Sequence, residues 1–399
     1  MEKNYTGLKV LDFTRVLAGP YLTMLLADNG AEVIKIEKPV TGADERSLAP
    51  IVKCADGKQQ SGYFMMLNRG KKSVTLDLKD SAAKEIIYKL MSWADVLCEN
   101  FAPGVMERLG FGYEKAKAIN PALVYCSIST FGQEGPLANR PGYDIIAQGM
   151  SGLMWLTGEP GKTPMRSGTS ICDVNAASHA FGAIGAALYY REKTGKGQYI
   201  DISLRDCMSA ILETGIVRYT ISHGEDKPDR SGAHHATMTP YGVYRAGEDA
   251  YITIAAINDR HWDTLCRLMG KETWGAQEKF QGSANRGKNK EEVISVIEAW
   301  LQSFGDKNEA LKTLNDNKVP AGDVYTIEEL LNEKQYRMRD NIVTVNDPVF
   351  GTIDLPATPM IFSETTVNNP TPPPELGANT EEVLRDILHL PEKEIKNFI

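Results

Sequence analysis

The sequence predicts an α/β protein in which an open parallel sheet, covered by helices on both faces, forms a large domain beside a smaller α+β domain. Short apolar segments alternate with helical patterns over the first 130 residues. The pattern changes after about residue 225, where a hairpin and amphipathic helices follow. The length of 399 residues allows two or three domains with a sizeable core.

Short apolar segments mark the strands of the predicted sheet. They lie at residues 8–13, 31–37, 72–78, 95–100 and 122–129. Between the first two, Gly19-Pro20 opens a helix that runs to about Asp28, and Gly30 closes it. A second helix spans 80–94, with Asp80 as its cap.

The second half of the chain has fewer strands. Residues 241–257 read as a hairpin, and residues 259–270 and 290–304 read as helices. A proline-rich strip at 369–377 precedes a last helix near 380–388.

Composition excludes several classes of protein. The net charge of −8 argues against a general nucleic-acid role. The charge-free stretch 174–190 is too short and too polar for a membrane span, and it predicts a buried helix. The six cysteines form no CxxC pair and no cluster at metal spacing, so we expect reduced thiols and no metal site. No apolar signal segment opens the sequence, so we expect a cytoplasmic protein without membrane partners.

Basic residues recur where the predicted strands end. Arg15, Lys38 and Lys79 follow three strands, and Asn100 and Phe101 follow a fourth. Arg108 comes shortly after, and Arg69, Lys71 and Lys72 precede the third strand. Ligands of open parallel sheets bind beyond the carboxyl ends of the strands, so this edge is expected to bind an anion, with an aromatic ring and an amide suited to a nucleotide.

The common nucleotide motifs are absent. VLDFTRVLAGP lacks the GxGxxG spacing, and LTGEPGKT (156–163) has Leu156 where a P-loop needs glycine. A dinucleotide-dependent dehydrogenase or a P-loop protein is therefore disfavoured.

Many blocks along the chain carry a resemblance through their spacing. They are LKVLDFTRVLAGPYLTMLLADNGAEVIKIEKP (8–39), LNRGKKSVTLDLK (67–79), ADVLCENFAPGVMERLG (94–110), NPALVYCSISTFGQEGP (120–136), RPGYDIIAQGMSGLMWLTG (140–158), SGTSICDVNAASHAFGAIGAALYYREKTGKG (167–197) and TGKGQYIDISLRD (194–206). The later PYGVY (240–244) and VPAGDV (319–324) fit the same pattern. In these blocks the chain resembles the family III CoA-transferases, which include carnitine, bile-acid and formyl-CoA:oxalate CoA-transferases.

The resemblance implies transfer of CoA from an acyl-CoA donor to a free carboxylic acid, with CoA as substrate and no permanently bound cofactor. It implies a Rossmann-like large domain built from residues 1–225 and 326–399, a small domain of residues 226–325, and two chains interlocked as a homodimer. The implied CoA contacts are Arg15, Val16, Ala18, Lys38, Leu76, Lys79, Asn100, Phe101, Arg108 and Leu109. Lys38 stands where the oxalate enzymes have an arginine, and a lysine lacks the planar fork that holds a phosphate through two parallel hydrogen bonds.

Asp173 and Tyr143 match active-site positions of the family. An aspartate before a helix is usually an N-cap, but here the resemblance assigns Asp173 as the nucleophile. Its reference pKa is about 3.9, and a helix N-terminus is expected to keep it ionised. Attack on the thioester then forms a mixed anhydride, and the CoA thiolate converts it to an aspartyl-CoA thioester. Tyr143 is a candidate hydrogen-bond donor to the oxyanion or to the substrate carboxylate, or else a packing residue.

Two alternatives remain at this point. The 2-methylacyl-CoA racemases share the fold and the aspartate but have a histidine at the position of Tyr143. A phenol, with a reference pKa near 10, is a poor substitute for that base. A non-catalytic acyl-CoA-binding protein would not need the retained Asp173.

The acid substrate is the least constrained feature. The region RSGAHHATMTPYGVY (230–244) lacks the glycine-rich loop of the oxalate enzymes, and Leu17 stands where they have glutamine. It most resembles family members that use succinate, glutarate and similar acids. We therefore expect a C4–C6 dicarboxylate, with His234 or His235, beside Arg166 or Arg230, near its second carboxylate; paired surface histidines without any function are the other interpretation.

Overall fold

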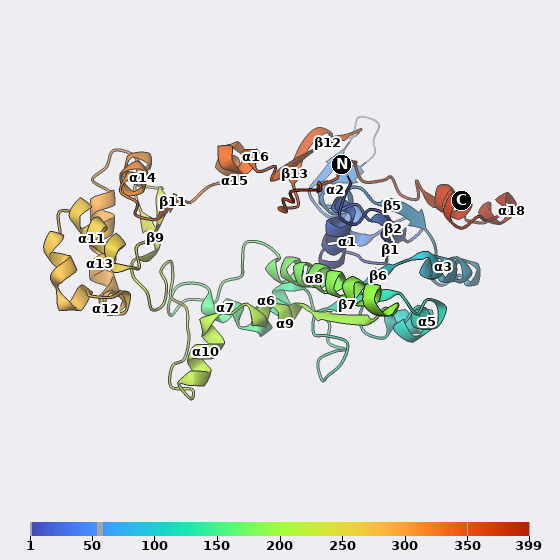
Figure 1. The fold of residues 1–399 in the computed structure, drawn as a ribbon, viewed down its shortest axis with the longest axis horizontal. Coiled ribbons are helices and arrows are strands. Elements are labelled where there is room, and N and C mark those ends of the chain that lie inside the picture. The colour runs from blue at the N-terminus through green and yellow to red at the C-terminus, as the bar shows by residue number, and fades with distance from the viewer. Residues whose placement is uncertain (1, 54–58, 349, 399) are drawn as a thin grey trace. The chain divides into compact units, whose positions relative to one another are not determined.

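The chain forms two compact units. The structure, a computed structural model, describes residues 2–53, 59–348 and 350–398 (Figure 1). The first unit comprises residues 1–151, 168–212 and 334–399, and the second comprises 152–167 and 213–333. These limits differ from residues 225 and 326, where the division was expected. That the units are separate domains stays a prediction.

Six parallel strands form the sheet of the first unit, in the order β5-β2-β1-β6-β7-β8 (Figure 1). The strands are β1 (Lys9–Asp12), β2 (Glu32–Glu37), β5 (Lys72–Thr75), β6 (Val96–Glu99), β7 (Val124–Ser129) and β8 (Tyr199–Ser203). The first five confirm the predicted strands, whereas β8, which is partly buried at the end of the sheet beside β7, was not predicted. Successive strands are added on one side of β1 as far as β5 and then on its other side from β6 onward. The switch point between β1 and β6 is where ligands bind in such folds.

Helices connect the strands of this sheet. The longer ones are α1 (Ala18–Asp28), α3 (Ser81–Trp93) and α8 (Ile171–Thr194). Asp80 caps α3 as predicted, since its carboxylate accepts a hydrogen bond of 2.9 Å from the backbone N–H of Ala82. Shorter helices near the sheet are η1 (Asp44–Ser47), α2 (Gly62–Asn68), α4 (Val105–Leu109), α5 (Tyr113–Ile119), α6 (Asp144–Ser151) and α9 (Leu204–Ala210).

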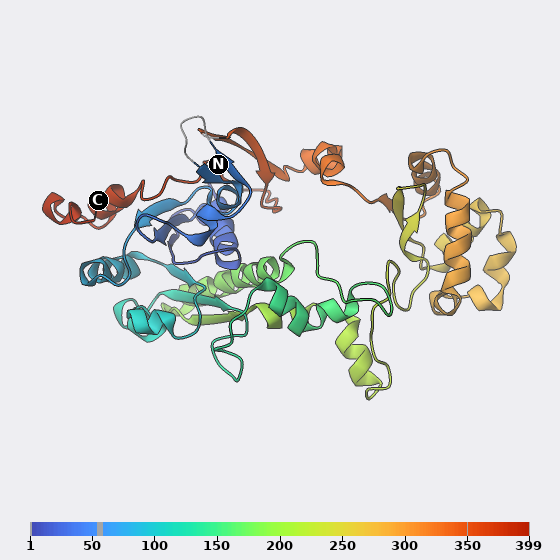
Figure 2. The ribbon, with the colours of Figure 1, turned by 180° about the vertical axis from the view of Figure 1, so that it is seen from behind.

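Helix α8 is only partly the buried helix that the sequence predicted. It lies along β7 and β8 (Figures 1 and 2), and it buries one face made mostly of small side chains. The opposite face is exposed, and Tyr189 is 66% accessible. A helix with few charges need not be surrounded by its own chain. Among the residues that the structure describes, no helix has the length and apolar content required to cross a membrane.

The C-terminal segment returns to the first unit. Thr380 accepts a hydrogen bond from the backbone of Thr75 on β5 through its hydroxyl, at 3.1 Å, and Val383 and Leu384 join the core under the sheet. The single helix expected near 380–388 is wrong in detail. The segment forms α17 (Thr380–Glu382), a π-helical turn (Val383–Ile387) and a further helix, α18 (Glu392–Ile395). An antiparallel pair, β12 (Ile342–Asp347) and β13 (Gly351–Pro356), precedes it.

The second unit contains a small antiparallel sheet in the order β11-β10-β9. Strands β9 (Tyr241–Arg245) and β10 (Tyr251–Ala255) confirm the predicted hairpin, and β11 (Ala321–Asp323) pairs with β10. The predicted helices are confirmed as α11 (Asp259–Leu268) and α13 (Lys290–Leu301), and α10 (Thr214–Ile221) and α14 (Lys307–Asp316) also belong to this unit. Its core is built around Trp262, Phe280 and Ile297.

Candidate active site

The residues expected to contact CoA gather at the carboxyl edge of four neighbouring strands. Because parallel strands end at the same edge, loops far apart in the sequence meet there. These residues are Arg15, Val16 and Ala18 after β1, Lys38 after β2, Leu76 and Lys79 after β5, Asn100 and Phe101 after β6, and Arg108 and Leu109 on α4.

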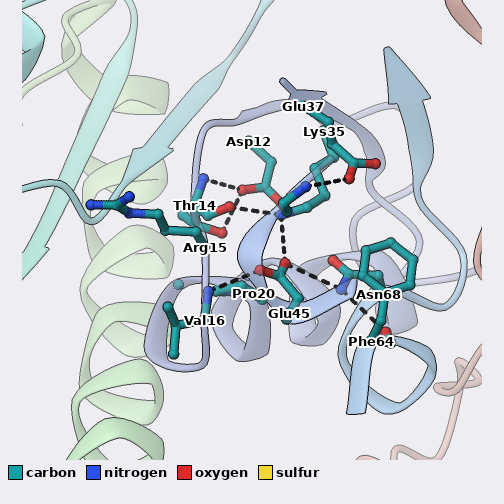
Figure 3. A network of polar contacts seen from close by, with 12 residues as sticks. Asp12, Thr14, Arg15, Val16, Pro20, Lys35, Glu37, Glu45, Phe64 and Asn68 are labelled. Atoms are coloured by element: carbon teal, nitrogen blue, oxygen red, sulfur yellow. Dashed lines mark hydrogen bonds and ion pairs between the residues drawn. The ribbon is translucent and has the colours of Figure 1, made fainter. Parts of the chain in front are cut away.

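Arg15, Asn100 and Phe101 form the centre of this group, across the β1–β6 switch point. The Asn100 side chain accepts a hydrogen bond from the backbone N–H of Arg15 at 2.9 Å and donates one to its carbonyl at 2.7 Å. The guanidinium of Arg15 lies 4.9 Å from the centroid of the Phe101 ring. In Figure 3 the Arg15 side chain points away from the buried network beneath it. A cation, an amide and an aromatic ring therefore share one exposed corner, a combination that suits a phosphorylated nucleotide.

The other expected contacts divide into two kinds. Lys38, Lys79 and Arg108 are exposed and free to meet an anion in solvent. Leu76 is only 2% accessible, and Leu109 packs against the core, so these two shape the floor of the edge.

Two of the basic residues noted before the third strand are not available to a ligand. Arg69 is fully buried and pairs with Asp28 at 2.7 Å. Lys71 is buried beside Asp12 at 3.2 Å, and burial lowers its pKa to about 8. Both charges form ion pairs in the interior of the fold. The periodicity and composition of the sequence do not show which basic residues are buried in this way.

Asp173 lies at the same edge of the sheet, on the first turn of α8. The helix leads into β8 and packs along β7 and β8, so it runs against the strand direction and begins at their carboxyl ends. The N-cap residue is Ser170, and the interpretation of Asp173 as the cap is wrong. Within the described chain, no hydrogen bond or ion pair involves the Asp173 carboxylate.

The cap of α8 comes instead from Asp144 at the start of α6. One oxygen of Asp144 accepts hydrogen bonds from the backbone N–H groups of Cys172 at 2.8 Å and Asp173 at 3.3 Å. Its other oxygen accepts a hydrogen bond of 2.6 Å from the Gln148 side chain. A second carboxylate therefore occupies the helix N-terminus that was expected to stabilise the charge of Asp173.

Burial raises the pKa of Asp173 from 3.8 to about 7, and the negative charge of Asp144 adds to the rise. This differs from the low pKa expected at a helix N-terminus. The causes of the rise are desolvation first and the neighbouring charge second.

Tyr143 is positioned near the site by the residues on either side of it, Gly142 and Asp144. Gly142 packs so closely on the Thr130 side chain, at the end of β7, that an added Cβ would lie 2.5 Å from its methyl carbon. This contact holds the turn at the sheet edge, immediately before the capping Asp144. The Tyr143 side chain is 71% accessible, so it faces solvent in a single chain.

Tyr63 on α2 is a residue near the site that sequence reasoning missed. Burial raises its pKa to about 12, and the nearby charge of Asp173 is the next cause. The segment SGYFMM carries no signal for such proximity, because only folding brings α2 close to Asp173.

His234 and His235 lie in the second unit and have local partners there. The His235 ring accepts hydrogen bonds of 3.2 Å from the backbone N–H groups of Thr237 and Met238. His234 packs edge-on against Tyr244 and lines a shallow pocket together with Glu291 and Glu298. Carboxylates in that pocket would oppose an acid substrate, and a substrate role for either histidine stays a prediction.

The described residues contain no group of three or more His, Cys, Asp or Glu side chains arranged to hold a metal ion. Five cysteines have free thiols in the structure, and Cys54 lies outside the described residues.

An exposed cation, an amide and an aromatic ring therefore lie at the same sheet edge as a carboxylate that has no partner within the described residues. The model of CoA-transferase family III matches residues 5–380, so the chain belongs to this family and is a CoA-transferase. It is 34% identical to the succinyl-CoA:glutarate CoA-transferase of Mus musculus, over all of this chain and 89% of that protein. It is 38% identical to the acetyl-CoA:oxalate CoA-transferase of Acetobacter aceti, over 90% of this chain and 89% of that protein.

A solved structure shares the fold. The crystal structure of a CaiB/BaiF family protein from Brucella suis has a TM-score of 0.86 and 34% identity, covering 97% of this chain and 100% of that one. The family and the parallel-sheet fold expected from the sequence are thereby confirmed. The family and the names of these relatives favour CoA transfer over the racemase and the non-catalytic alternatives.

Proposed function

We propose that this enzyme transfers CoA from an acyl-CoA donor to a C4–C6 dicarboxylic acid through covalent intermediates on Asp173. The observation that carries the proposal is the Asp173 carboxylate, which has no hydrogen-bond or ion-pair partner in the described chain and lies at the edge where the expected CoA contacts gather. A structural carboxylate at a helix start normally caps that helix, and here Asp144 already does so.

Four displacements complete the reaction. An Asp173 oxygen attacks the donor thioester, the carbon–sulfur bond breaks, and CoA leaves as thiolate. The thiolate attacks the aspartyl carbonyl of the anhydride and releases the donor acid. The acceptor carboxylate attacks the aspartyl-CoA thioester, again releasing CoA thiolate. This thiolate takes the acceptor acyl group and restores Asp173, so no net proton, electron or metal is consumed.

The raised pKa of Asp173 adds a condition to this chemistry. Only the carboxylate form is a nucleophile, so attack by the free enzyme requires loss of the proton that binds with a pKa of about 7. The same desolvation that raises the pKa leaves the anion less well solvated, which favours its attack on the thioester.

CoA is expected to bind through the ten residues at the sheet edge, with Arg15, Asn100 and Phe101 at its centre. Tyr143, beside the capping Asp144, remains the candidate donor to the oxyanion or to the substrate acid. The choice of a dicarboxylate is supported by the names of the relatives, since one names glutarate and another oxalate. Glutarate has five carbons and lies within the C4–C6 range, whereas oxalate has two and lies outside it. His234 and His235 contribute little to that choice because their local partners already explain their positions.

A homodimer is part of the proposal, and the exposed surface of one chain supports it. The α10 side chains Ile216, Val217 and Ile221 are each about half or more accessible. On the open face of α8, a Cβ added at Gly182 would meet nothing within 4 Å among the described residues. Apolar and small-residue faces left in water are typical of an interface. Sedimentation should give twice the chain mass of 44.0 kDa at micromolar concentration, and a stable monomer would contradict the dimer.

A trapping experiment tests the covalent route. Hydroxylamine added with an acyl-CoA donor should convert Asp173 to a hydroxamate, located by peptide mass spectrometry. An Asp173→Asn variant is the matched control and should give no adduct. Modification elsewhere, or substantial transfer by the variant, would refute the assignment.

A substrate panel tests the acid. Acetyl-, succinyl- and formyl-CoA are each paired with mono- and dicarboxylic acids, and kcat/KM is compared. C4–C6 dicarboxylates should lead. Preference for oxalate or for a bulky aromatic acid would overturn that part, and deuterium uptake at C2 of a 2-methylacyl-CoA without CoA exchange would indicate a racemase. We expect the enzyme to act in the cytoplasm, which fractionation can check.

A further inference from the structure

Side chains from other segments form hydrogen bonds with the backbone of the loop that follows β1. The Thr14 N–H donates to Asp12 at 2.8 Å, and its carbonyl accepts from the Lys35 ammonium at 2.7 Å. Asn100 pairs with both polar groups of the Arg15 backbone. A loop with its polar groups assigned in this way has few alternative conformations.

Val16 is the strained point of this loop. Its φ is +66°, a left-handed conformation that a β-branched residue rarely adopts. Its N–H donates to the Glu45 carboxylate at 3.0 Å (Figure 3). Such strain persists only where the surroundings impose it, and it concentrates at functional sites.

Glu45 lies on η1, in the segment that follows β2, and is fully buried. Its other oxygen pairs with the buried Lys35 ammonium at 3.0 Å and accepts a hydrogen bond of 3.4 Å from the Asn68 side chain (Figure 3). An apolar pair of similar volume would serve stability equally well, because burying two charges has a high desolvation cost. The ion pair does what an apolar pair cannot, since it offers an acceptor to Val16 and a donor to Thr14.

We propose that Glu45 is a positioning residue for acyl-CoA. Its carboxylate, oriented by Lys35, holds Val16 in the left-handed conformation and so presents Arg15 over Phe101. This inference rests on the proposed function, in which the β1 loop binds CoA. Glu45 itself need not touch the substrate, because no part of it is exposed.

The test is Glu45→Gln in the full-length protein. The amide removes the charge opposite Lys35 and weakens the acceptor for Val16 while keeping the side-chain shape. We expect the Kd for CoA by calorimetry and the KM for acyl-CoA to rise about tenfold, as for other losses of positioning contacts. The KM for the acid should stay within twofold, and amide exchange of residues 13–17 should become faster by mass spectrometry.

Glu32→Gln is the matched control. Glu32, at the start of β2, pairs with Lys72 on β5 at 2.7 Å, is partly exposed and makes no contact with the β1 loop among the described residues. The CoA affinity and loop exchange of the Glu32→Gln variant should therefore equal those of the wild type. If Glu45→Gln does not fold, Glu45→Asp keeps the charge but withdraws the acceptor from Val16, and it should show the same selective rise.

The outcomes separate the two proposals. A rise in acyl-CoA KM alone, with faster loop exchange, supports the role of Glu45. Weakened CoA binding by Arg15→Ala but not by either Glu45 variant overturns that role and leaves the CoA site in place. Unchanged CoA binding by Arg15→Ala refutes the proposed site, and the positioning role with it.

Discussion

The β1 loop and the first turn of α8 lie at the same sheet edge but are stabilised in opposite ways. Four side chains bind the backbone N–H and carbonyl groups of Thr14 and Arg15 and the N–H of Val16. The Asp173 carboxylate has no hydrogen-bond or ion-pair partner within the described residues, although its own backbone N–H is capped by Asp144. The contrast shows that side chains bind the backbone of one region, whereas the carboxylate of the other has no partner among the described residues, as the proposed nucleophile requires.

The electrostatics of the two regions differ in the same sense. Asp12 lies beneath the loop with Lys71 and Lys35 nearby, and its pKa is lowered despite the opposing effect of burial. Asp173 faces Asp144 instead, and its pKa rises to about 7. Opposite charges favour the ionised form of Asp12, whereas a like charge disfavours the ionised form of Asp173.

Replacing Asp173 should give the largest effect. Asp173→Asn is expected to lower kcat by about 10³–10⁴-fold or more, because it removes the proposed nucleophile. A folded-state pKa raised above the unfolded value means that ionisation of Asp173 destabilises the fold as pH rises from about 4 to 7. The variant should therefore have a higher Tm at pH 8, by about 2–4 °C, and little gain at pH 4.

Calorimetry at the two pH values, beside steady-state kinetics, checks both parts. A Tm that rises equally at pH 4 and pH 8 would show that the raised pKa is not the cause.

Releasing the loop from Asn100 should give the next largest effect. Asn100→Ala removes two hydrogen bonds to the Arg15 backbone and should raise the KM for acyl-CoA about tenfold. Asn120→Ala is the matched control, because that amide also makes two hydrogen bonds to the backbone, donating to the carbonyls of Met91 and Ala94. The control should lose stability without a change in KM, and equal KM effects in the two variants would remove the distinction.

Removing the like charge beside Asp173 should have a moderate effect on the pH dependence of catalysis. Asp144→Asn keeps an oxygen for the backbone N–H groups of Cys172 and Asp173 but removes the like charge. The pKa of Asp173 should fall below its value of about 7 yet stay above 3.8, because burial, the larger cause, remains. The acidic limb of the kcat/KM profile should move down in pH by less than two units, and an unmoved limb would contradict the contribution of Asp144.

Relieving the strain of the loop should give the smallest effect. Val16→Gly suits φ +66° and should stabilise the protein by about 1 kcal/mol in urea unfolding, after allowance for the greater freedom of glycine in the unfolded chain. Val33→Gly, in the buried interior of β2, should instead destabilise it by more than 2 kcal/mol. Similar losses in both variants would mean that Val16 is not strained.

Much of the fold could be predicted because its signals are local. The apolar segments of β1, β2 and β5 and the cap at Asp80 are visible within a few residues, and the structure contains all of them. The strand β8 and the C-terminal π-helical turn escaped prediction, since both depend on packing against distant segments. The half-exposed face of α8 was missed because low charge alone does not say what covers a helix.

The sequence by itself determined which residue types follow each strand, and therefore which side chains gather at the carboxyl edge. Tertiary structure alone decided how they act. The charge of Asp144 acts on Asp173 across 29 residues of chain, and Glu45 accepts a hydrogen bond from Val16 across 29. A pKa or a strained turn depends on distances between atoms and on burial, and these exist only once the chain has folded.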